Sequence, residues 1–246
     1  TLKAISQSEN NPKLVLNMHE NYSAAVLNYP WAQSRFWKVL TRAEAWKKIE
    51  FSLLKQMDYT LVVCKEFKQK LTEEYQNLNS DKIIVYPNVP SLNEFQNYPV
   101  DTSVYKKSDN EFLLFYFGVI AKRRGIFDCL KSLDRLKKYP NIKLMIIGPM
   151  DKNDRVLYYK MIQDLNLEDR IIYYPWKDIS LLPSYLTLVD LCLSPLEKSE
   201  QHDTTYANKI FQYMLFENPT LLSDVLPQKT LVENTKCGEL HIAHDH

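Results

Sequence analysis

Glycine and cysteine are both rare in this sequence of 246 residues, which contains four of each. The cysteines lie far apart, with no C-x-x-C pair and no histidine at metal-ligand spacing, which argues against a zinc site or a disulfide scaffold. No apolar run approaches the length of a membrane span, and nothing near Thr1 resembles a signal peptide. We therefore expect free thiols in a reducing compartment, most of them buried, at Cys64, Cys129, Cys192 and Cys237.

A strong charge of either sign is also absent. The chain has 31 Lys and Arg against 30 Asp and Glu, a net charge of +1. It therefore lacks the basic field with which nucleic-acid-binding proteins attract phosphates, and we expect no nucleic-acid partner. Hydrophobic residues make up 45% and charged residues 25%, which is ordinary for a soluble α/β protein. This length can hold two domains of modest size.

The most informative stretch is 112–125, FLLFYFGVIAKRRG. Its apolar run is typical of a strand buried in a parallel sheet, Gly118 permits a tight turn, and a helix is predicted over 126–138. The loop between them carries three cations beside the helix N-terminus, where a diphosphate binds favourably. They are Lys122, Arg123 and Arg124. An ordinary turn with solvated basic residues is the alternative, and this stretch alone leaves both interpretations open.

Strands and helices alternate along the chain, which predicts an α/β fold with parallel sheets. The expected strands are 13–18, 59–64, 82–86, 112–117, 143–147, 170–174, 191–194, 220–223 and a last one from Gly238. The polar stretch 89–110 contains two prolines and shows no periodicity. We therefore predict an N-terminal domain over 1–95, a linker over 96–110 and a C-terminal domain over 111–246.

The first predicted strand ends at His19 and Glu20. In open α/β sheets the carboxyl ends of the strands form the edge at which ligands bind. A His-Glu pair there could act on a hydroxyl group or hold a substrate by hydrogen bonds. A pair that only anchors its loop is the alternative, and the dipeptide does not decide between them.

Aromatic and basic residues are interleaved over 31–48. Such a mixture suits an anionic membrane surface, with aromatic rings at the level of the headgroups and cations outward. It also suits an amphipathic core helix with a solvated basic face, because Trp and Phe also fill cores. We favour the core helix and keep peripheral contact with the inner membrane face as the alternative.

Several short segments carry a family pattern. They are His19-Glu20, Glu50 with 57–63 (MDYTLVV), 85–88 (VYPN), 116–118 (YFG) with Arg124-Gly125, 146–148 (IIG), 207–214 (ANKIFQYM), 218–220 (NPT) and Cys237-Gly238. In this order and spacing they resemble the retaining GT-B glycosyltransferases of family 4. The resemblance implies two Rossmann-like domains facing a cleft. It also implies a nucleotide-sugar donor on the C-terminal domain and an acceptor bound with the help of the N-terminal domain, which is partial here.

The resemblance also assigns roles to residues. The donor-binding positions are Gly118, Lys122, Arg124, Gly148, Trp176, Lys209 and Gln212. The cations would neutralise the diphosphate without a metal ion or any other cofactor, Gln212 would hold the ribose, and Trp176 would flank the nucleobase. His19 falls where the family contacts the transferred sugar near its reacting centre, and Glu20 would position the loop or the acceptor.

The sequence departs from the family pattern in three ways. The two glutamates that commonly flank the ribose-binding helix are replaced by the neutral Thr204 and Gln212, which removes a charged acceptor for the ribose hydroxyls. Val119 stands where an arginine often follows the first glycine. By this comparison the chain also begins inside the N-terminal domain and stops before the closing helices, so we expect it to be truncated at both ends.

The resulting hypothesis is a metal-independent, hexosyltransferase-type enzyme of polysaccharide biosynthesis in the cytoplasm. It would transfer a sugar, with retention, from a UDP- or GDP-sugar to a glycan or lipid-linked acceptor. Two alternatives remain open. A nucleotide-sugar epimerase or phosphorylase of GT-B architecture would need a fuller set of acid and base side chains. A non-catalytic GT-B-like partner subunit is favoured by Gln212 and opposed by the cationic loop.

Overall fold

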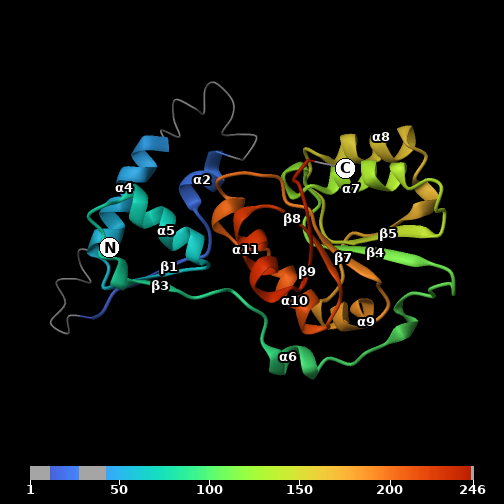
Figure 1. Ribbon diagram of the computed structural model, residues 1–246, viewed down its shortest axis with the longest axis horizontal. Coiled ribbons are helices and arrows are strands. Elements are labelled where there is room, and N and C mark those ends of the chain that lie inside the picture. Colours follow the sequence, from blue (N-terminus) through green and yellow to red (C-terminus); the bar gives the residue numbers. More distant parts are fainter. Residues whose placement is uncertain (1–11, 28–42, 245–246) are drawn as a thin grey trace. The chain divides into compact units, whose positions relative to one another are not determined.

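The computed structural model describes residues 12–27 and 43–244. This part of the chain divides into two compact units (Figure 1). The first unit consists of the described residues up to Asn88 together with Glu200–Tyr206, and the second consists of Val89–Ser199 and the residues from Ala207 onward. The chain therefore leaves the second unit for a short segment before α10 (Lys209–Leu215) and then returns to it.

The first unit contains a parallel three-stranded sheet in the order β1-β2-β3. Its strands are β1 (Val15–Met18), β2 (Tyr59–Val62) and β3 (Ile83–Val85), and its helices are α2 (Tyr22–Leu27), α4 (Ala43–Gln56) and α5 (Lys65–Glu74). Because side chains alternate between the faces of a strand, Met18, Val62 and Ile83 all point into one core, where they pack with residues of α4 and α5.

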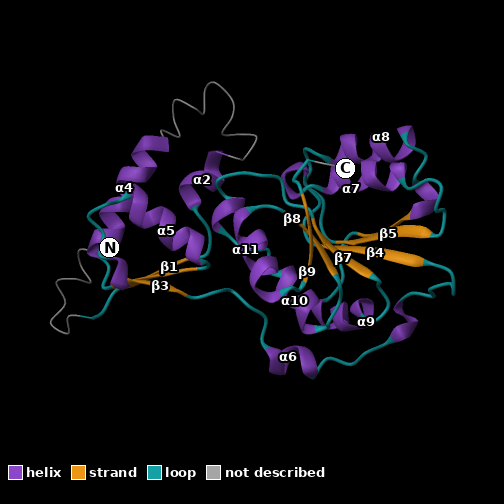
Figure 2. Ribbon diagram, viewed as in Figure 1, coloured by secondary structure: helices purple, strands orange, loops and turns teal. Residues whose placement is uncertain are grey.

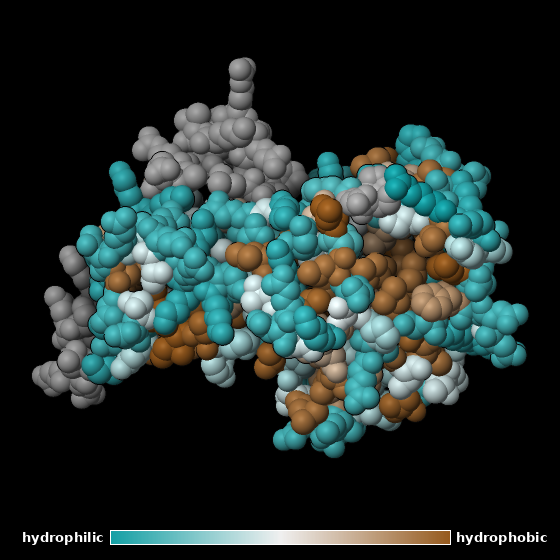
Figure 3. Space-filling view, viewed as in Figure 1, coloured by the Kyte–Doolittle hydropathy of each residue, from teal (hydrophilic) through white to brown (hydrophobic). Residues whose placement is uncertain are grey.

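The opposite face of this sheet is apolar and exposed. Val15, Tyr59 and Ile84 keep 54%, 45% and 43% of their surface accessible. Figure 3 shows hydrophobic surface on the lower side of the first unit, where Figure 1 draws its strands. Parallel sheets usually have both faces covered, so the described part of this unit has only one of the two layers that such a sheet requires.

The second unit contains a parallel six-stranded sheet in the order β6-β5-β4-β7-β8-β9. The strands are β4 (Phe112–Phe117), β5 (Ile142–Ile147), β6 (Ile171–Tyr174), β7 (Leu191–Ser194), β8 (Thr220–Ser223) and β9 (Gly238–His241). Counted from the first strand of this unit, the order is 3-2-1-4-5-6, that of a Rossmann fold. The direction of winding reverses between β4 and β7, and ligands bind at such a switch point.

Helices cover both faces of the second sheet (Figure 2). The helices are α7 (Ile126–Arg135), α8 (Arg155–Asp164), α9 (Leu182–Leu186), α10 (Lys209–Leu215) and α11 (Leu226–Thr235). Tyr116 and Leu144 share one core with α7 and α8, whereas Phe115 and Met145 share another with α9 and α10. The alternating side chains of β4 and β5 therefore feed two separate cores, as their continuous apolar sequences predict.

The segment that we predicted as a linker, 96–110, packs on the second unit. It follows α6 (Leu92–Gln96), whose Phe95 is buried in the same core as α9. The amide of Asp101 donates a hydrogen bond to Ser184 Oγ at 2.9 Å, and Lys107 Nζ lies 2.6 Å from Asp190 Oδ2. The proline-containing, polar sequence of this segment did not predict these contacts. Each contact joins the segment to a residue more than 80 positions away.

Other expectations concern the cysteines and the aromatic, basic segment. The four cysteines are free thiols, and three of them are buried, as expected. Residues 31–42 lie outside the described residues, and the rest of the predicted segment opens α4. Within the described parts of the chain, no helix combines the length and the apolar character that crossing a bilayer requires.

Candidate functional site

Three loops meet at the carboxyl edge of the second sheet. Gly148 follows β5 with φ of 150°, and a Cβ at this position would lie 2.0 Å from the carbonyl oxygen of Gly118, which follows β4. Gly125 has φ of 75°, and a Cβ there would lie 1.6 Å from the carbonyl oxygen of Pro195, directly after β7. Only glycine permits these approaches, so the loops after β4, β5 and β7 come together at the switch point.

The cationic loop lies between these glycines. Lys122–Arg124 form one turn of 3-10 helix, and Gly125, the N-cap residue of α7, has no side chain with which to cap it. The amide of Lys122 donates a hydrogen bond to Asp154 Oδ2 at 2.7 Å, while its side chain is exposed. The uncapped N-terminus of α7 presents backbone N–H groups beside the cations, as predicted from the sequence.

Lys209 is the most unusual cation of the site. It is the first residue of α10, only 8% exposed, and its Nζ lies 3.6 Å from the centroid of the Tyr116 ring. Burial and the nearby positive charge of Arg124 lower the pKa of the Lys209 ammonium well below its ordinary value. Among the described residues, no carboxylate lies within ion-pair distance of Lys209 Nζ.

Two buried tyrosines hold the surroundings of Lys209 in place. The hydroxyl of Tyr116 donates to the carbonyl oxygen of Val119 at 2.7 Å, which fixes the loop after β4. The hydroxyl oxygen of Tyr213, on α10, accepts a hydrogen bond from the amide of Phe117 at 3.0 Å. Burial raises the pKa of both phenols, so they remain neutral. The hydrogen bond of Tyr213 thereby ties α10, which carries Lys209, to β4, which ends directly before Gly118.

The predicted nucleoside-binding residues, Gln212 and Trp176, lie on different elements of the second unit. Gln212 is half-buried, one turn after Lys209 on α10. Trp176 is 66% exposed beyond the end of β6. Its loop is joined to the glycine loop of β5, because the amide of Gly148 donates to the carbonyl oxygen of Tyr174 at 3.0 Å. An exposed indole beside this edge is available to stack on a ring.

His19 and Glu20 belong to the first unit. His19 is exposed at the end of β1, and the half-buried Glu20 accepts a hydrogen bond through Oε2 from Gln201 Nε2 at 2.8 Å. Gln201 is part of Glu200–Tyr206, the segment of the first unit that comes from the C-terminal half of the chain. Glu20 therefore anchors a segment 181 residues away in the sequence.

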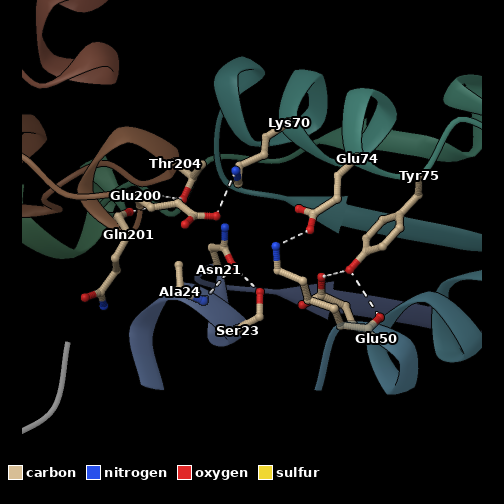
Figure 4. A network of polar contacts seen from close by, with 11 residues as sticks. Asn21, Ser23, Ala24, Glu50, Lys70, Glu74, Tyr75, Glu200, Gln201 and Thr204 are labelled. Carbon is tan, nitrogen blue, oxygen red and sulfur yellow. Dashed lines mark hydrogen bonds and ion pairs between the residues drawn. The ribbon is translucent and has the colours of Figure 1, made fainter. Parts of the chain in front are cut away.

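Further contacts of this segment were not predicted. Lys70 Nζ lies 2.8 Å from Glu200 Oε1, as Figure 4 shows. Thr204 is buried, and its Oγ1 donates to the carbonyl oxygen of Glu200 at 2.9 Å. Thr204 thus closes a turn of its own segment. The polar sequence of this stretch gave no signal of its docking.

The structure therefore brings together most of the predicted donor-site residues and leaves others apart. Gly118, Gly148, Arg124 and Lys209 gather at the switch point, with Gln212 one turn away. Lys122 extends into solvent at its rim. Among residues 12–27 and 43–244, no cluster of three or more His, Cys, Asp or Glu side chains is placed to hold a metal ion.

Comparisons with known proteins agree with this geometry. The family model described as glycosyl transferases group 1 matches residues 97–246. Sucrose-phosphate synthase from Thermosynechococcus elongatus has a similar structure, with a TM-score of 0.75 and 18% identity over 99% of this chain and 57% of that one. Anabaena HepE in complex with UDP gives a TM-score of 0.71 and 15% identity over 100% of this chain and 64% of that one.

A third similar structure is the N-terminal domain of Candida albicans trehalose-6-phosphate phosphatase, with a TM-score of 0.73 and 11% identity over 99% of this chain and 57% of that one. The chain thus spans about six tenths of the length of these structures. A search of the curated proteins found no match. At these identities the structural likeness establishes the GT-B fold of two Rossmann-like units.

Proposed function

The chain belongs to the glycosyl transferases group 1 family, and from this premise we propose that it is a retaining, hexosyltransferase-type glycosyltransferase. It would transfer a sugar from a UDP- or GDP-sugar to a glycan or lipid-linked acceptor. The observation that supports this proposal most directly is the buried ammonium group of Lys209, which lies near Arg124 at the switch point of the second sheet.

Two neighbouring cations in a buried place destabilise each other unless an anion binds between them. Lys209 loses hydration by burial, and the charge of Arg124 adds to the cost of keeping its ammonium charged. A diphosphate at this place would meet both cations and the N–H groups that open α7. It would also restore the pKa of Lys209, so nucleotide binding is coupled to proton uptake at alkaline pH.

The same cations give the site a chemical role. In the transfer, the bond between the anomeric carbon of the donor and the diphosphate oxygen breaks, and a bond to the acceptor oxygen forms on the same face of the sugar. The electron pair of the broken bond stays on the nucleoside diphosphate, whose departing oxygen takes up the proton that the acceptor hydroxyl loses. Arg124 and Lys209 would stabilise the negative charge that develops on the leaving group, which supports a reaction without a metal ion.

The other predicted residues have supporting roles in this proposal. Gln212 would accept a hydrogen bond from a ribose hydroxyl, and Trp176 would stack on the nucleobase. His19 would contact the transferred sugar near the reacting carbon, and Glu20 would position its own loop through Gln201. Structures of Anabaena HepE have been described in complex with UDP and with UDP-glucose, which supports a nucleotide sugar as the donor of this chain too.

The acceptor and the cellular location belong to the same proposal. WaaG, a structure similar to this chain, is described as involved in lipopolysaccharide biosynthesis. That description supports a glycan or lipid-linked acceptor and a role in polysaccharide biosynthesis. We place the reaction in the cytoplasm, and contact of residues 31–48 with the inner membrane face is the alternative to a core helix in that segment.

The first test is calorimetric titration of the chain with UDP, GDP and ADP in metal-free buffer. We expect saturable binding of UDP or GDP, with proton uptake at alkaline pH that disappears in Lys209→Met. Arg124→Ala should weaken binding about tenfold or more, because a charge-assisted contact to phosphate is lost. Arg123→Ala is the matched control and should change the affinity by less than about twofold.

Two results would contradict the proposal. Equal losses in Arg124→Ala and Arg123→Ala would show that the diphosphate does not lie where we place it. Tight binding of UDP or GDP without release of UDP or GDP from a sugar donor, with any acceptor supplied, would favour a non-catalytic subunit, an interpretation that the neutral Gln212 also favours.

A further inference from the structure

The first unit contains a cavity of about 290 Å³ beside the predicted catalytic pair. It lies at the carboxyl end of β1, between α2 and α4, and His19 and Glu20 form part of its lining. All of its lining residues belong to the first unit. Because a small-molecule site is usually a concave place with a few polar groups, this cavity is a candidate subsite for the acceptor.

The walls of this cavity are mainly apolar. Tyr22, Trp46 and Ile49 line it, and they keep 50%, 38% and 49% of their surface accessible. The rings of Tyr22 and Trp46 meet edge to face, with centroids 5.5 Å apart. Three large apolar side chains that gather in an open cavity mark a binding site, because single exposed apolar residues are usually scattered.

Polar contacts of α2 and α4 stabilise the walls of the cavity. Asn21 Oδ1 accepts hydrogen bonds from Ser23 Oγ at 2.8 Å and from the amide of Ala24 at 3.1 Å, which caps α2 (Figure 4). On α4, Glu50 Oε1 accepts a hydrogen bond from the hydroxyl of Tyr75, on the turn after α5, at 2.9 Å. The two helices that carry the apolar walls are therefore fixed before a ligand arrives, which lowers the entropic cost of binding.

The charged side chains that line the cavity indicate which type of ligand it can bind. Its charged lining residues are Glu20 and Glu50, and no Lys or Arg is found among the described residues that line it. An anionic group, such as the diphosphate of a lipid carrier, would meet carboxylates and apolar rings instead of cations. An uncharged apolar group meets no such penalty, and its burial is favourable.

From these observations we propose that the cavity binds an uncharged apolar portion of the acceptor, an alkyl or aryl group linked to the hydroxyl-bearing part. This inference rests on the proposed function, because His19 is expected to contact the reacting sugar. The accepting hydroxyl would then lie at the mouth of the cavity near His19 and Glu20, with the apolar group between α2 and α4. An acceptor of this class differs from a free oligosaccharide, which has no apolar group to bury.

The test uses methyl, n-hexyl and n-octyl β-D-glucoside as probes, titrated by calorimetry below their micelle concentrations. We expect affinity to rise about threefold for each added methylene until the cavity is full. Ile49→Ala should weaken binding of the octyl glucoside about threefold or more, and Trp46→Ala about tenfold or more. Ile84→Ala is the matched control: Ile84 is similarly exposed in the same unit but lies on the bare sheet face, so octyl glucoside should bind unchanged.

The outcomes separate this inference from the proposed function. Affinity that does not depend on chain length, or equal losses in Ile49→Ala and Ile84→Ala, would overturn the apolar subsite even if UDP or GDP binds. Failure of every nucleotide to bind, with chain-length dependence intact, would instead overturn the glycosyltransferase proposal and the identification of the ligand as an acceptor.

Discussion

The two units of the molecule are built from the same strand and helix pattern, but they differ in how completely the described residues cover their sheets. The second sheet has six strands with a core on each face. The first has three strands, one core and an exposed apolar face that includes Tyr59 and Ile84. Since buried apolar area is the main source of stability, we expect the second unit to be the more stable one.

The two units also differ in the type of ligand that their surfaces suit. The second unit places cations and helix N-termini at a rigid sheet edge, which suits a highly charged donor. The first unit offers an apolar cavity beside a His-Glu pair, which suits a weakly polar ligand. If the two proposals hold, donor and acceptor recognition rest on different physical forces, and each can be weakened without the other.

The largest expected effect comes from removing a core leucine in one unit at a time. Leu130 is fully buried in the second unit and Leu71 almost fully in the first, so truncation to alanine should cost about 2–5 kcal/mol in either case. Hydrogen exchange read by mass spectrometry should show faster exchange for Leu71→Ala in the first unit, including residues 200–206, and for Leu130→Ala in the second. Faster exchange throughout the molecule in both variants would mean that the two cores unfold as one.

A smaller effect is expected from Glu50→Gln. Burial raises the pKa of Glu50 despite its hydrogen bond from Tyr75, and the carboxylates of Glu74 and Glu200 act in the same direction while Lys47 opposes them. The folded state therefore binds the proton more tightly than the unfolded state, so this group favours folding below its ordinary pKa of about 4.3 and that contribution is lost as the pH rises through the raised value.

Glutamine keeps the acceptor for Tyr75 and removes the charge. Glu50→Gln should therefore increase the free energy of unfolding at pH 7 by less than about 1 kcal/mol, because water still screens this half-buried group, and so raise the melting temperature. The gain should vanish near pH 4. Melting curves between pH 4 and pH 8 test this, and a gain that is independent of pH would contradict the assignment.

The smallest effect is expected from the ion pair that holds the returning segment. Lys70→Met should reduce the stability of the first unit by about 0.5 kcal/mol, since both partners are partly exposed. Lys160→Met, which breaks the exposed pair with Asp164 on α8, is the matched control in the second unit. Exchange of residues 200–206 should become faster only in Lys70→Met, and an equal response to both substitutions would argue against an anchoring role for Lys70.

The sequence predicted the parts of this structure that depend on local patterns. Apolar runs located the strands of the described residues, and the glycines with the cations of 118–125 located the sheet edge where we propose the donor site. The family pattern added Lys209, although not its burial against Tyr116. That burial depends on which helix packs against which strand, and local periodicity carries no such information.

The unpredicted features all join distant parts of the chain. Gln201 meets Glu20 across 181 positions, and the hydroxyl of Tyr213 meets the amide of Phe117 across 96. A polar loop and a solvent-exposed docking segment have the same composition, so the docking of 200–206 could not be inferred from it. The packing of 96–110 on the second unit could not be predicted for the same reason, because its contacts join residues more than 80 positions apart.

The return of the chain to the first unit has a consequence for exchanging parts between related proteins. The chain crosses between the units after Asn88, after Ser199 and after Tyr206. A hybrid joined once, after Asn88, would combine an N-terminal half from one parent with a 200–206 segment shaped for the other. Glu20, Lys70 and the core around Tyr206 would then meet foreign partners. A hybrid that respects the structure takes 200–206 from the same parent as the N-terminal half, and so requires three junctions.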